Sequence, residues 1–84
     1  MNREMLQQLL TTAKPGWRIK VDPNLSVATG NTHPNMVQYK GKLLSITDIN
    51  HYYVYVKEDN ANFSWDYHHI VEVIPPILLK RKPS

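Results

Sequence analysis

The sequence contains no cysteine, so neither a disulfide framework nor a thiolate metal site can supplement its core. It also has no long hydrophobic run, and its apolar runs fall far short of the roughly 20 residues that span a bilayer. Charged and polar residues among the first leucines break any apolar segment typical of a signal peptide. These absences predict a soluble, cytoplasmic protein with no membrane association.

Motifs for catalysis and for cofactor binding are absent as well. No serine or lysine stands in a recognisable arrangement with a histidine or a carboxylate. The three glycines are isolated, so there is no phosphate-binding loop. The four histidines, His33, His51, His68 and His69, lack the ligand spacing of a metal site. We therefore expect surface histidines, no cofactor and no enzymatic activity.

The net charge of +3 belongs to the end of the chain. Lys80, Arg81 and Lys82 supply three of the ten basic residues, and the remaining seven are balanced by seven acidic residues. Binding to phosphates usually requires a basic patch on the folded surface. The charge distribution therefore weakens a nucleic-acid interpretation.

An N-terminal helix is predicted over residues 1–14, with Asn2 as its N-cap and a stop at Lys14-Pro15-Gly16. Its apolar stripe consists of Met5, Leu6, Leu9, Leu10 and Ala13. The helix could close one end of a barrel, or it could dock on a partner or a second copy.

A β domain is predicted over residues 15–74, followed by a flexible tail over 75–84 that starts at two prolines. Apolar and polar residues alternate in five short segments, which predict strands at 17–22, 42–49, 52–57, 63–65 and 70–74. Val54 and Val56 are expected to face the core, and Ile49 is out of phase, which suggests a bulge. Residues 23–35 form a long loop, with Leu25 and Val27 expected beneath it. These features predict a mainly β protein, a small five-stranded antiparallel barrel.

Seven of the eight aromatic residues lie between positions 39 and 67. Four of them are expected to build the core and its lids: Trp17, Tyr39, Phe63 and Trp65. Tyr53 and Tyr55 face away from the core and are predicted to bind a partner together with Tyr67. Two alternatives stay open: the tyrosines could pack under the N-terminal helix, or they could stack on nucleic-acid bases. Base stacking needs interleaved cations, which are scarce around these tyrosines.

The tail joins an apolar triplet, Ile77-Leu78-Leu79, to a basic cluster. It could be a solvated end, a segment that binds a partner, or an arm for nucleic acid. The candidate binding residues in this segment are Leu78, Leu79, Lys80, Arg81 and Lys82.

An ordered series of residues spans much of the predicted β domain. It comprises Met36-x-x-Tyr39-x-Gly41-Lys42, Ile46, Glu58-Asp59 and Phe63-x-Trp65. This series resembles the Mind-bomb-type SH3-like repeat, especially the stand-alone versions of bacteriophages and prophages of low-GC Gram-positive bacteria. The resemblance covers roughly residues 15–74. It implies an SH3-like barrel without catalytic machinery, and in larger relatives such a domain recognises peptide segments of other proteins.

The sequence and the resemblance together predict a non-catalytic binding module. We expect a phage or prophage accessory protein that binds a host protein and modulates it, by inhibition or by redirection. A small barrel that binds nucleic acid is the alternative, and the salt dependence of binding distinguishes the two.

Overall fold

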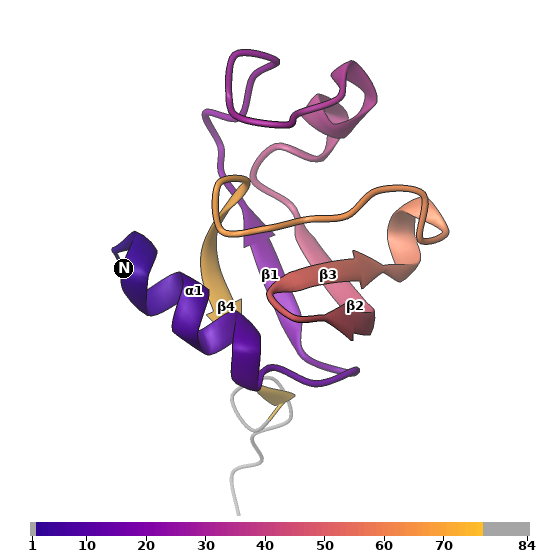
Figure 1. Cartoon of the computed structure of the whole chain (residues 1–84). Helices are drawn as coiled ribbons and strands as arrows, with labels where there is room; N and C mark the ends of the chain where they lie inside the picture. Colours follow the sequence, from indigo (N-terminus) through magenta and orange to yellow (C-terminus); the bar gives the residue numbers. More distant parts are fainter. Residues whose placement is uncertain (1, 77–84) are drawn as a thin grey trace, which may run out of the picture.

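The computed structural model describes residues 2–76, which form one short helix and one β-sheet (Figure 1). The elements are α1 (Arg3–Thr12), β1 (Arg18–Val21), the 3₁₀ helix η1 (Pro34–Tyr39), β2 (Leu43–Asn50), β3 (Tyr53–Val56), the 3₁₀ helix η2 (Lys57–Asp59) and β4 (Ile70–Ile74). The four strands form one antiparallel sheet in the order β3-β2-β1-β4, and no ladder joins β3 to β4 within residues 2–76. The mainly β class is confirmed, and the sheet is open.

The segment predicted as a fourth strand at 63–65 makes a single bridge in place of a ladder. Trp65 and Val54 exchange two backbone hydrogen bonds of 2.8 Å each. The chain reaches this point through η2 and two left-handed residues, Asn60 and Ala61, and it then runs past β3 in an extended path (Figure 1). Because the residues after β3 form this turn, they cannot pair with β3, and the predicted strand is reduced to one bridge.

Helix α1 begins at the predicted cap and packs beside β4 (Figure 1). The Asn2 side chain accepts a hydrogen bond from the Met5 backbone N–H at 2.8 Å, which satisfies one of the free amides of the first turn. Leu6 and Leu10 are buried against the sheet, whereas Met5 is exposed. The predicted stripe is therefore right at its centre and wrong at Met5, which lies at the edge of the apolar face.

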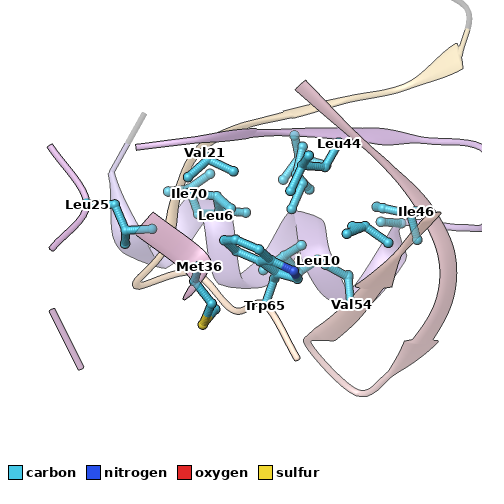
Figure 2. Close-up of a cluster of buried hydrophobic side chains, with 14 residues drawn as sticks. Leu6, Leu10, Val21, Leu25, Met36, Leu44, Ile46, Val54, Trp65 and Ile70 are labelled. Atoms are coloured by element: carbon cyan, nitrogen blue, oxygen red, sulfur yellow. The ribbon is translucent and has the colours of Figure 1, made fainter. Parts of the chain in front are cut away.

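The core lies between the sheet and the helix, around the fully buried Trp65 (Figure 2). Strand alternation follows the prediction: Val54 and Val56 are both buried. The predicted bulge is also present, because the register of β2 against β3 shifts between Ile46 and Asp48. The shift explains why Ile49 is out of phase with the earlier residues of β2.

The loop between β1 and η1 is only partly as predicted. Leu25 is buried, but the Val27 side chain is 60% exposed. The Thr29 backbone N–H donates to the Ser26 carbonyl at 2.9 Å, which closes a tight turn with Val27 at its tip. A residue at the tip of such a turn projects away from the core, so the prediction for Val27 is wrong.

Candidate functional site: an aromatic row beside the β2–β3 hairpin

Beside the hairpin of β2 and β3, four partly exposed rings contact one another in a spatial row, in the order Tyr53, Tyr52, Tyr67 and His68. We call them the aromatic row. Tyr53 stacks on Tyr52 with ring centroids 4.7 Å apart, and Tyr52 meets Tyr67 edge-on at 5.8 Å. Tyr67 in turn stacks on His68 at 4.2 Å. The row joins two segments of the chain into one aromatic surface.

The hairpin turn positions the first half of the row. Asn50 pairs with Tyr53 at the end of the ladder, so that His51 and Tyr52 form a two-residue turn. His51 adopts a left-handed φ of 58°, which short hairpin turns require and which His tolerates better than most residues. Tyr52 therefore leaves the strand beside Tyr53, and their rings stack.

A second turn positions the other half. The Trp65–Val54 bridge holds the chain against the start of β3, and the His69 backbone N–H then donates to the Asp66 carbonyl at 3.0 Å. Asp66 Oδ1 accepts the His68 backbone N–H at 2.8 Å, the side-chain-to-backbone bond of an Asx turn. Tyr67 and His68 are thereby fixed next to Tyr52.

The buried Asp66 carboxylate also orients the His68 ring. His68 Nδ1 lies 3.1 Å from Asp66 Oδ1, while the His68 side chain is 35% exposed. A carboxylate at Nδ1 favours the tautomer that carries its proton there. The other ring nitrogen, Nε2, is then left as an acceptor.

His69 is not the surface residue that the sequence suggested, because it is 1% exposed. Its Nδ1 accepts the Asp66 backbone N–H at 3.0 Å, which leaves Nε2–H to donate to the Gly30 carbonyl at 3.0 Å. Both ring nitrogens have partners, so a neutral imidazole can be buried here. The residue ties the loop after β1 to the turn that carries the row.

The environment of Tyr52 disfavours its phenolate. The Tyr53 side chain raises the pKa of Tyr52, first as its hydrogen-bond partner and second as a neighbouring ionisable phenol, and burial and the Asp66 carboxylate act in the same direction. The phenol is therefore held in its neutral, hydrogen-bonding form.

The predicted binding residues divide into three groups. Tyr53 and Tyr67 both belong to the row and are connected through Tyr52. Tyr55 lies two residues further along β3, half-buried and opposite Asp48 of β2. The tail residues Leu78, Leu79, Lys80, Arg81 and Lys82 lie outside the described residues.

The alternative in which helix α1 packs on Tyr53 and Tyr55 is wrong. The buried residues of α1, Leu6 and Leu10, belong to the same core cluster as Val54. Successive side chains of a strand point to opposite faces, so the helix packs on the Val54 face of β3. The tyrosines of β3 are left for another role.

Sequence reasoning missed Tyr52 and His68. The signals were present: Tyr52 ends an Asn-His-Tyr hairpin turn, and Asp66 stands two residues before His68, the spacing of an Asx turn. These turns indicate that Tyr52 lies next to Tyr53 and His68 next to Tyr67, but they do not indicate that the two pairs meet.

The acidic turn and the tryptophan of the motif have structural roles. Glu58 Oε1 accepts the Ser45 backbone N–H at 2.8 Å, which extends the β2 ladder beyond the end of β3. Asp59 Oδ2 accepts the indole Nε1–H of Trp65 at 2.9 Å inside the core. Tyr39 meets Trp65 edge-on with centroids 5.9 Å apart. These contacts stabilise the core and the turn after β3.

The described residues offer no enclosed site. They contain no group of three or more metal-ligating side chains, and no pocket is found on them. No helix within residues 2–76 has the length and apolarity needed to cross a membrane. What this part of the chain presents is an open aromatic surface. Comparison of the chain with models of protein families, with curated proteins and with solved structures finds no match.

Proposed function

We propose that the protein is a non-catalytic SH3-like binding module, a phage or prophage accessory protein that binds a host protein and modulates it. The aromatic row is its docking surface, and modulation results from occupancy of a site on the partner. The observation that carries this proposal is the row itself: four rings from two segments of the chain, each in contact with the next and partly exposed.

Strand order supports the SH3-like part of the proposal. β1, β2 and β3 follow one another in the sheet, the Trp65 bridge continues beyond β3, and the last strand returns to pair with β1. Such an order, with the bridge as a much reduced fourth strand, is that of an SH3-like barrel. The structural roles of Tyr39, Asp59 and Trp65 account for the residues on which the family resemblance rests.

The composition of the row supports a protein partner. Tyrosines give a large contact area, lose little conformational entropy on binding, and carry a polar tip. A surface that stacks bases would need cations between the rings. Here the residues next to the rings in the chain include no lysine or arginine, and the charge that acts on Tyr52 is negative. These features favour protein over nucleic acid.

The test is a pull-down with the tagged full-length chain from a lysate of a Gram-positive host, with and without nuclease. The proposal expects a stoichiometric protein that survives nuclease and is lost with Tyr53→Ala or Tyr67→Ala. Val27→Ala is the matched control, because Val27 is exposed and lies on the loop after β1, outside the row.

A second variant at position 67 tests the same contact if Tyr67→Ala unfolds the domain. Tyr67→Leu retains apolar bulk against the core and removes the ring and its hydroxyl. Capture that persists in both Tyr53 and Tyr67 variants would refute the row as the docking surface. Proteins that appear only without nuclease would favour the nucleic-acid alternative.

A further inference from the structure

Two carboxylates flank the aromatic row. Asp66 lies at its His68 end, and its negative charge acts on the phenol of Tyr52. Asp48 lies near its Tyr53 end: it is exposed and stands opposite Tyr55 in the β2–β3 ladder, one pleat from the Asn50–Tyr53 pair. Directly opposed residues of an antiparallel ladder project from the same face. The Asp48 carboxylate therefore shares a face with the two tyrosines of β3.

No lysine or arginine neutralises these carboxylates within residues 2–76. The basic side chains closest to Asp66 Oδ1 are the imidazoles of His68, at 3.1 Å, and His69, at 3.3 Å, and both are neutral in the hydrogen-bonding pattern described above. Asp48 Oδ1 accepts the backbone N–H of Ile49 at 2.9 Å. Tyrosine faces carry negative potential, and a carboxylate beside them adds to it. Asp66 is buried, so the exposed Asp48 carboxylate makes the Tyr53 end of the row complementary to a cation.

The Tyr53 ring is the part of the row best suited to receive that cation. Tyr52 stacks on one of its faces at 4.7 Å, and no other aromatic ring within the described residues contacts it. A planar guanidinium can stack on such a ring and form a forked pair with a carboxylate, which the compact ammonium of lysine cannot.

We propose that the aromatic row receives an arginine-bearing basic segment of the partner protein, with a guanidinium stacked on Tyr53 and paired with Asp48. This inference rests on the proposed function, because it specifies the chemistry of the partner for the same surface. It assigns Asp48 a role in recognition, which the sequence did not suggest.

The experiment measures binding of labelled peptides to the full-length chain by fluorescence anisotropy, with amide NMR shifts to locate the contact. The probes are a Gly-Ser-spaced arginine peptide, the same peptide with glutamine at each arginine, and an oligothymidylate. We expect saturable binding of the arginine peptide alone, with shifts at Tyr53 and Asp48. Tyr53→Ala and Asp48→Asn should each weaken binding about tenfold.

Glu72→Gln is the matched control, because it removes one exposed carboxylate from β4, at the other end of the sheet from β3. It should change affinity by less than about twofold. Tyr53→Leu keeps apolar bulk without a π face and should weaken binding as Tyr53→Ala does, so a folding defect in the alanine variant would not hide the result.

Equal binding of the arginine and glutamine peptides would overturn the inference, as would equal losses in Asp48→Asn and Glu72→Gln. Binding of oligothymidylate in place of the arginine peptide would do the same. If the arginine peptide fails while Tyr53→Ala still abolishes capture of a host protein, the inference fails and the proposed function stands. If the Tyr53 and Tyr67 variants capture the host protein as well as the unmodified chain does, the proposed function fails.

Discussion

The indole Nε1–H of Trp65 donates to Asp59 Oδ2 over 2.9 Å, and both side chains are buried. This bond connects the turn after β3 to the ring at the centre of the core. The other carboxylate oxygen, Oδ1, is buried with no hydrogen-bond partner within residues 2–76. Within residues 2–76 the Asp59 side chain therefore makes one hydrogen bond, the one to Trp65.

Replacing Asp59 tests this contact. Asp59→Ala should lower the free energy of unfolding by about 1–3 kcal/mol, because the buried indole N–H loses its acceptor. Asp59→Asn should cost less than Asp59→Ala, since the amide oxygen can still accept the indole N–H. Urea denaturation followed by circular dichroism gives both values. Equal costs for the two variants would show that the hydrogen bond is not the source of the stability.

The left-handed conformation of Ala61 predicts a stabilising substitution. Ala61 has a φ of 60°, in a region that disfavours side chains with a Cβ atom. Ala61→Gly should raise the free energy of unfolding by about 1 kcal/mol because it relieves this strain. Ala28→Gly is the control: Ala28 is exposed and has no positive φ, so the added backbone freedom should destabilise it by roughly 0.5–1 kcal/mol. A gain in both variants would contradict the argument.

Sequence periodicity predicted the local structure better than the site. The alternation that buries Val54 and Val56 and the phase slip at Ile49 are short-range patterns, and they predicted β3 and the bulge in β2. The prediction of a fourth strand at 63–65 was wrong, because only Trp65 pairs with β3, in an isolated bridge. The residues before it form the turn around η2 and are not available for a ladder.

The site depends on contacts that periodicity does not encode. Tyr53 and Tyr67 are 14 positions apart and meet only through Tyr52, once two turns have formed. His69 was misassigned because a histidine is buried only where both nitrogens find partners, and one of them is the carbonyl of Gly30, 39 residues away. Such pairings follow from the fold as a whole.

Removing the His69 imidazole should release the loop after β1. His69→Phe keeps the ring volume but leaves the Asp66 N–H and the Gly30 carbonyl without their partner. We expect a loss of about 2 kcal/mol in unfolding free energy and faster amide hydrogen exchange over residues 22–33. His51→Asn is the control, because this exposed turn position has a φ of 58° that asparagine tolerates. Unchanged exchange in His69→Phe would mean that contacts independent of the imidazole hold the loop, such as the Asp22 N–H bond to the His69 carbonyl.

Tyr52 should titrate later than an ordinary tyrosine, whose pKa is about 10. Its pKa is raised chiefly by the Tyr53 side chain, so the folded protein retains a proton that the unfolded chain has already lost. The resulting stability is complete below the ordinary pKa and is lost as pH rises through the raised value.

Tyr53→Phe removes the largest cause of the raised Tyr52 pKa and should return the Tyr52 transition toward its ordinary position, as measured by ¹³C NMR of the tyrosine Cζ atoms across alkaline pH. Tyr55→Phe is the control and should leave the transition where it is, because Tyr55 does not contribute to the shift. A Tyr52 transition at the ordinary value in the unmodified protein would contradict the stacked arrangement of Tyr52 and Tyr53 and, with it, the geometry of the row.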